Sequence, residues 1–121
     1  IVAVPIANLP AFLTRTRWFA LEERGPFDIN RIFPGSPKGV LSERIAYTLF
    51  HDFVLKADYT VDFHCGLAGC NMHPFVYVDP ADDETGTLAL RVRMAQAFGT
   101  DLVYYKIRGV KLGTSAMTAS L

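Results

Sequence analysis

An acid, an amide and a guanidinium group lie close together in the run DINRIFPG, which covers residues 28–35. The Pro-Gly end of this run disfavours both helix and strand, so we expect a rigid loop. Guanidinium groups suit planar, bidentate binding of a carboxylate, and Arg17 could join Asn30 and Arg31 in binding one or in polarising a reacting carbonyl. The structural alternative is a network in which Asp28 pairs with an arginine and Asn30 caps a turn.

A second candidate residue is His64, which ends an alternating run of apolar and polar residues. On a strand, Asp62 and His64 would share one face. A histidine at a strand end, beside a loop with glycine, lies where α/β proteins bind ligands, and imidazole is the commonest metal-binding side chain. The alternative is a core histidine that is hydrogen-bonded to Asp62. One histidine cannot hold a catalytic zinc ion alone, because such a site needs about three protein ligands.

Two cysteines and two histidines fall within one short stretch, at His64, Cys65, Cys70 and His73. These four side chains could hold a structural zinc ion in a non-enzymatic binding module. The spacing is not that of a standard zinc finger, however, and neighbours on a strand such as His64 and Cys65 point to opposite faces. Two cysteines are too few for a disulfide scaffold, so we expect free thiols and a cytoplasmic protein.

The elements that must position these residues follow from hydrophobic periodicity and from the turn residues. Ser42 is the expected N-cap of the clearest helix, and Glu22 and Glu23 are expected to be solvated loop charges. The element order predicts an α/β protein with a mixed sheet flanked by helices in one domain. The expected strands cover residues 1–5, 58–65, 75–78 and 102–107, the expected helices 8–14, 42–56 and 85–98, and a long loop 18–39.

Composition excludes several classes of partner. The chain has 121 residues with 12 basic and 12 acidic side chains, a net charge of zero and no basic stripe, so we expect no nucleic acid partner. No apolar run reaches the ~20 residues of a membrane span, whereas a homo-oligomer is compatible with the sequence. The chain opens in an expected strand without Met and closes in an expected helix, which predicts an incomplete domain.

Several short motifs, taken in their order and spacing, resemble the succinylglutamate desuccinylase/aspartoacylase family, a branch of the zinc carboxypeptidase-like hydrolases. The resemblance covers residues 1–121 and corresponds to the central part of the family's catalytic domain. It implies a zinc-carboxypeptidase-like fold. The motifs are Asn8-x-x-Ala11, Thr16-Arg17, residues 28–35, Glu43-Arg44-Ile45-Ala46 and Asp62-Phe63-His64.

The resemblance also implies a role for each matching residue. His64 would be a zinc ligand, Arg17 would polarise the scissile carbonyl, and Asn30 with Arg31 would bind the substrate's carboxylate. Asp28 would orient a zinc-binding histidine. The family's His-x-x-Glu zinc motif would precede the chain and its catalytic glutamate would follow it, so we expect the 121 residues alone to be inactive.

The function that the resemblance implies is zinc-dependent hydrolysis of the amide bond in N-acyl amino acids or related small amides. The enzymatic alternative is a zinc carboxypeptidase that acts on short peptides. It would share both the zinc ion and the binding of a carboxylate.

Overall fold

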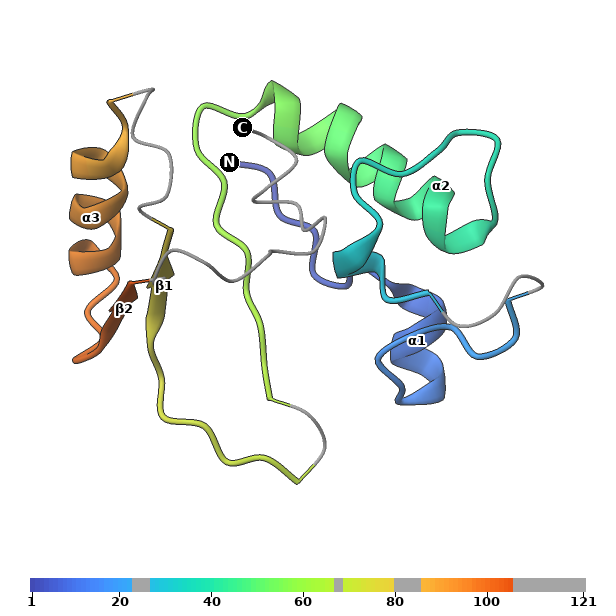
Figure 1. Ribbon diagram of the computed structural model, residues 1–121, viewed down its shortest axis with the longest axis horizontal. Helices are drawn as coiled ribbons and strands as arrows, with labels where there is room; N and C mark the ends of the chain where they lie inside the picture. Colours follow the sequence, from blue (N-terminus) through green and yellow to red (C-terminus); the bar gives the residue numbers. More distant parts are fainter. Residues whose placement is uncertain (23–26, 67–68, 80–85, 106–121) are drawn as a thin grey trace. The chain divides into compact units, whose positions relative to one another are not determined.

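The computed structural model describes residues 1–22, 27–66, 69–79 and 86–105 (Figure 1). The described residues divide into two units, residues 1–63 and residues 64–105. In the first unit lie α1 (Leu9–Thr14), the 3-10 turn η1 (Ile29–Arg31), α2 (Leu41–Thr48), the π-helical η2 (Leu49–Phe53) and the 3-10 turn η3 (Val54–Lys56). In the second unit lie β1 (Val76–Val78), α3 (Leu88–Ala97) and β2 (Val103–Tyr105).

The helix expected over residues 8–14 is confirmed as α1. Asn8 is its N-cap, and its side-chain Oδ1 accepts a hydrogen bond from the Ala11 amide at 3.2 Å. Pro10 occupies the first turn, where a missing N–H costs no helical hydrogen bond. Arg15 adopts a left-handed conformation with φ of 55° and ends the helix. The chain therefore leaves α1 just before Arg17.

The helix expected over residues 42–56 is confirmed as the continuous series α2, η2 and η3. Its N-cap, however, is Val40, and the expectation that Ser42 caps the helix is wrong. Two carboxylates accept from the backbone here instead: Glu43 Oε2 from the Val40 amide at 2.9 Å, and Glu22 Oε1 from the Ser42 amide at 3.0 Å. Glu22 is only 9% exposed, so the expectation of a solvated charge is also wrong at this residue.

The core of the first unit lies between the 28–35 loop and α2 with its continuation. Phe33, Ala46 and Phe50 are buried, and the rings of Phe33 and Phe50 have centroids 6.4 Å apart. Ala46 and Phe50 are four residues apart and so lie on one face of the helix. Ile29 and Ile32 from the same loop pack against this cluster. The loop is therefore fixed to the helix by its apolar residues, while Asp28 and Asn30 are half-buried and Arg31 is exposed.

The second unit is a β-α-β arrangement. β1 and β2 pair in parallel with Val76 opposite Val103, and α3 joins them in sequence and packs on β1 (Figure 1). Val78 and Ala95 are buried where the helix meets the strand. The strands expected over 75–78 and 102–107 and the helix over 85–98 are confirmed within the described residues; residues 85, 106 and 107 lie outside them. A two-stranded parallel sheet with helices agrees with the predicted α/β class.

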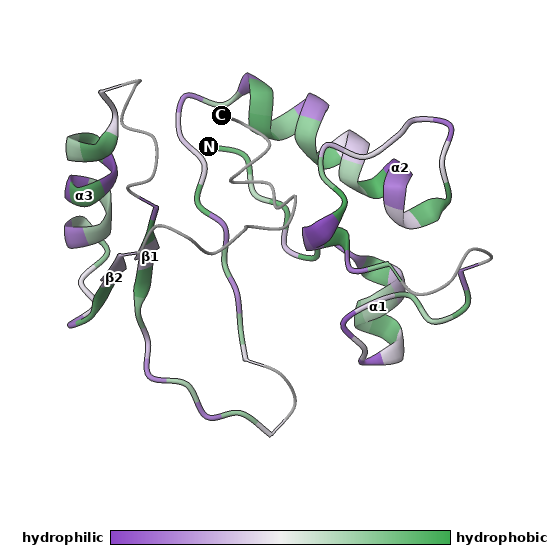
Figure 2. Cartoon of the chain, viewed as in Figure 1, coloured by the Kyte–Doolittle hydropathy of each residue, from purple (hydrophilic) through white to green (hydrophobic). Residues whose placement is uncertain are grey.

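The prediction of two of the strands is wrong. Residues 1–5 and 58–65 carry no strand in the structure, and side chains in both segments are exposed, with Val2 at 75% and Phe63 at 76%. Figure 2 shows why the second segment suggested a strand, because hydrophobic and hydrophilic residues alternate along it. Alternation sets which side chains share a face, but a strand also needs a paired neighbour, and neither segment is paired within the described part of the chain. In the whole described part of the chain, no helix is long and apolar enough to cross a membrane.

Candidate functional site

The end of the 28–35 loop contacts the backbone of α2 directly. Gly35 has φ of +81°, and a Cβ at this residue would lie 2.3 Å from the Glu43 carbonyl oxygen and 2.4 Å from the Tyr47 amide nitrogen. The Gly35 amide donates to the Ile32 carbonyl at 2.8 Å, and the next amide, that of Ser36, donates to the Glu43 carbonyl at 3.1 Å. Glycine is required here both for its left-handed conformation and for this close approach.

The start of the loop is organised by Asp28. Its Oδ1 accepts a hydrogen bond from the Asn30 amide at 3.0 Å, which caps the 3-10 turn η1. Its Oδ2 accepts from Arg17 Nε at 2.7 Å in an ion pair. One carboxylate therefore holds both the turn and the arginine. The pairing of Asp28 with an arginine is the one that the structural alternative predicted, but the residue that caps the turn is Asp28 and not Asn30. The same network brings together four of the five residues expected to form the site.

The cluster of Arg17, Asp28, Asn30 and Arg31 presents donors to solvent. Arg17 bonds Asp28 through Nε, and within the described residues its two terminal nitrogens have no partner. The side-chain amide of Asn30 likewise has no hydrogen bond to any described residue. Arg31 is exposed, and its Nη1 donates to the Asn30 carbonyl at 3.0 Å. Arg17 and Arg31 each bring a guanidinium group to this cluster, and guanidinium groups suit a small anion such as a carboxylate.

The fifth expected residue, His64, begins the second unit and is exposed. It is the zinc ligand that the family resemblance implies. Within residues 1–22, 27–66, 69–79 and 86–105, no three or more His, Cys, Asp or Glu side chains are grouped so that they could hold a metal ion. The described residues therefore do not by themselves form a zinc centre, and the role of His64 stays a prediction.

The alternative of a structural zinc ion gains no support from the same finding. His64, Cys65, Cys70 and His73 all belong to the described residues, and they do not form such a group. Both cysteines are free and exposed. The expectation of free thiols is therefore confirmed.

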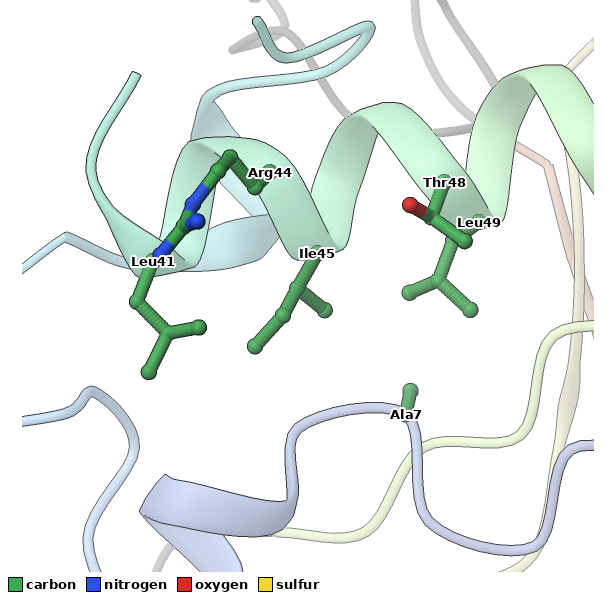
Figure 3. A pocket seen from close by; sticks show the side chains of 6 residues that line it. All are labelled: Ala7, Leu41, Arg44, Ile45, Thr48 and Leu49. Atoms are coloured by element: carbon green, nitrogen blue, oxygen red, sulfur yellow. The ribbon is translucent and has the colours of Figure 1, made fainter. Parts of the chain in front are cut away.

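One hollow of the first unit is largely apolar and has a volume of about 390 Å³. Leu41, Ile45 and Leu49 point into it from one face of the α2–η2 helix, with Ala7 opposite (Figure 3). None of the expected site residues lines it. We therefore place the candidate site at the charged cluster and not in this hollow.

Two polar residues were not predicted from the sequence. Glu22 is buried against Ser42, and no local pattern points to a partner twenty positions away. Asp79 follows β1 directly and is 9% exposed, and its carbonyl accepts from Arg91 Nη1 at 3.0 Å. Its position after a parallel strand is where α/β proteins place ligand-binding residues, and this signal was available in the sequence.

An aromatic cluster covers part of the second unit. The rings of Tyr77 and Tyr104 stack across the β1–β2 pair with centroids 5.8 Å apart, and Phe75 meets Tyr104 edge-on at 6.3 Å. Burial raises the pKa of Tyr77 above its ordinary value of 10.0, and the charges of Asp79 and Tyr104 raise it further. The hydroxyl of Tyr77 therefore stays protonated to a higher pH than that of a solvated tyrosine.

Fold and site together define an α/β protein in which Arg17 and the 28–35 loop bring guanidinium and amide donors together, a combination that suits a small anion. The family model for the succinylglutamate desuccinylase/aspartoacylase catalytic domain matches residues 1–120, and the chain belongs to this family. This confirms the resemblance predicted from the motifs.

A curated relative is the N-alpha-acetyl-L-2,4-diaminobutyric acid deacetylase of Halomonas elongata, which is 30% identical over 83 residues. The match covers 69% of this chain and 23% of the relative, so the chain spans about a quarter of that protein's length. No solved structure gives a significant match. The names of the family and of the relative both denote enzymes that remove acyl groups.

Proposed function

We propose that the full-length protein is a zinc-dependent deacylase that hydrolyses the amide bond of an N-acyl amino acid. The observation that carries this proposal is the cluster of Arg17, Asp28, Asn30 and Arg31, held on α2 by the 28–35 loop. Membership of the family and the similarity to a deacetylase support the reaction type.

Each side chain in the cluster has a separate task in this proposal. The substrate's carboxylate accepts hydrogen bonds from the Arg31 guanidinium and the Asn30 side-chain amide, which fixes the orientation of the amide bond. Arg17 donates from its terminal nitrogens to the scissile carbonyl oxygen. That oxygen gains negative charge as the tetrahedral intermediate forms, so the hydrogen bond strengthens in the transition state.

Asp28 orients Arg17, because its bond to Nε holds one edge of the guanidinium group and leaves the two terminal nitrogens for the substrate. We also propose that Asp28 accepts a hydrogen bond from a zinc-binding histidine, since each carboxylate oxygen can accept more than one bond. We assign His64 as one zinc ligand, with its partners supplied from outside the described residues. A zinc ion bound there would supply a water molecule of lowered pKa.

The proposal is tested with the purified full-length protein and matched substrates. We expect it to release the acid from N-acetyl or N-succinyl amino acids, with N-alpha-acetyl-L-2,4-diaminobutyrate as the first substrate because of the relative's name. C-terminal amides of the same compounds should react far more slowly, since they lack the carboxylate. Cleavage of short peptides without any deacylation would refute the proposal in favour of the carboxypeptidase alternative.

We further propose a cytoplasmic location, which the two free, exposed thiols Cys65 and Cys70 support. Fractionation of cells that produce the full-length protein tests this directly. Recovery of the protein with the membrane or the secreted fraction would contradict it.

A further inference from the structure

Glu22 is a buried acid whose two carboxylate oxygens are both bonded to one residue. The amide of Ser42 donates to Oε1 at 3.0 Å, and the hydroxyl of Ser42 donates to Oε2. Ser42 has no exposed surface, and Glu22 is 9% exposed. Lys38 and Arg44 line the same hollow as Glu22 and place positive charge near it. A buried carboxylate with these partners is a fixed anchor and not a solvated side chain.

This anchor joins two distant segments of the first unit. The Ser42 amide lies in the first turn of α2, where backbone N–H groups lack helical partners and a negative charge is favourable. The carboxylate that binds it comes from twenty positions upstream, on the segment that follows Arg17. The start of α2 therefore also holds the chain that carries Arg17.

The other half of the candidate site rests on the same helix. Ser36 donates to the Glu43 carbonyl and Gly35 lies against the helix backbone, so the loop with Asn30 and Arg31 is mounted on α2. The segment that carries Arg17 and the loop that carries Asn30 and Arg31 are thus both attached to α2.

The direct contact between these two segments, an ion pair, is weaker than their attachment to α2. The ion pair of Arg17 with Asp28 has side chains 36% and 19% exposed. Such an ion pair can orient the guanidinium group, but it contributes little free energy to holding the two segments together, because water and salt screen it. The buried bonds of Glu22 are not screened in this way.

We propose that Glu22 is a positioning residue: its bonds to Ser42 hold the Arg17 guanidinium in place beside the substrate-binding loop. This inference rests on the proposed function, because it assigns to Glu22 an effect on the reaction that Arg17 assists. Glu22 itself touches neither substrate nor metal in this account.

The test is a double-mutant cycle in the full-length protein with an N-acyl amino acid as substrate. Glu22→Ala should lower kcat about tenfold with little change in KM, because Arg17 acts in the transition state. In an Arg17→Ala background, Glu22→Ala should cause no further loss, since the residue it positions is gone. Should Glu22→Ala fail to fold, Glu22→Gln retains an acceptor for the Ser42 amide and should show a smaller loss with the same coupling.

Glu43 offers a matched control, because its carboxylate also accepts at the start of α2 but from the local Val40 amide at 2.9 Å. Glu43→Ala removes a cap of the same helix without releasing the upstream segment. Its effect on kcat/KM should therefore be the same with or without Arg17. If the loss from Glu22→Ala also persists undiminished in the Arg17→Ala background, the positioning role is refuted.

Hydrogen exchange supplies a measurement that does not depend on turnover. Backbone amides of residues 15–22 should exchange faster in Glu22→Ala than in the wild type, and should be unchanged in Glu43→Ala. Equal exchange in both variants would overturn the inference. A wild-type protein that hydrolyses no N-acyl amino acid would instead refute the proposed function. Hydrogen exchange would then still show whether Glu22 holds residues 15–22 in place.

Discussion

Replacement of Gly35 by alanine tests whether the substrate-binding loop is held by direct contact with α2. The added Cβ would lie 2.3 Å from the Glu43 carbonyl oxygen and 2.4 Å from the Tyr47 amide nitrogen. Both are backbone atoms of a helix, so neither can rotate away as a side chain would. The loop must move, and Asn30 and Arg31 must move with it.

The expected loss of stability in Gly35→Ala has two parts. A non-glycine residue in the left-handed region costs roughly 1–2 kcal/mol, and Gly35 has φ of +81°. Forcing extra volume into a packed contact costs about 1–3 kcal/mol more. We therefore expect Gly35→Ala to lower the free energy of unfolding by roughly 2–5 kcal/mol.

Gly99 provides the matched control, because its φ of +78° is nearly the same but nothing lies within 4 Å of an added Cβ. Gly99→Ala should therefore show only the conformational part. Denaturant unfolding of both variants of the full-length protein measures the difference, which should be about 1–3 kcal/mol, and kcat/KM should fall only in Gly35→Ala. Equal losses of stability in the two variants would show that the loop does not contact α2 as described.

Three further predictions concern single side chains. Asp28→Asn should lower kcat, measured by steady-state kinetics, because Arg17 loses its charged partner. The free energy of unfolding, measured with denaturant, should fall by less than about 1 kcal/mol, since the ion pair is partly exposed. His64→Ala should abolish bound zinc in the full-length protein, whereas Cys70→Ser should leave the metal content measured by mass spectrometry unchanged. The pKa of Tyr77 in the folded state is raised above 10.0, so its stabilising contribution is complete below pH 10.0 and is lost as the pH rises through the folded-state pKa. As the pH is raised into this range, the free energy of unfolding, measured with denaturant, should therefore fall less in Tyr77→Phe than in the wild type.

Local chemistry made part of this molecule predictable. Asp28, Asn30 and Gly35 each carry a preference that acts within a few residues, and the structure shows a cap, a turn and a left-handed glycine at those positions. The helices over 8–14 and 42–56 follow in the same way from periodicity and from the cap at Asn8.

Long-range pairing was not predictable from the same signals. Glu22 differs from a solvated loop glutamate only through a partner twenty positions away, and that partner, Ser42, was expected to cap the helix with its own side chain. Residues 1–5 and 58–65 have the composition of strands, but strand formation depends on a neighbour that composition does not specify. The roles of Arg17 and His64 stay predictions.

The preference for a free carboxylate over a neutral amide shows whether the candidate site binds the substrate's carboxylate. For the full-length protein, kcat/KM is measured for an N-acyl amino acid and for its C-terminal amide, in the wild type, in Arg31→Ala, and in Arg93→Ala as an exposed control on α3. A hydrogen bond to a charged group contributes about 1.5–3 kcal/mol, so Arg31→Ala should reduce the preference for the acid by roughly ten- to a hundredfold. Arg93→Ala should keep the full preference. If Arg31→Ala discriminates between acid and amide as strongly as the wild type, the cluster does not bind the substrate's carboxylate.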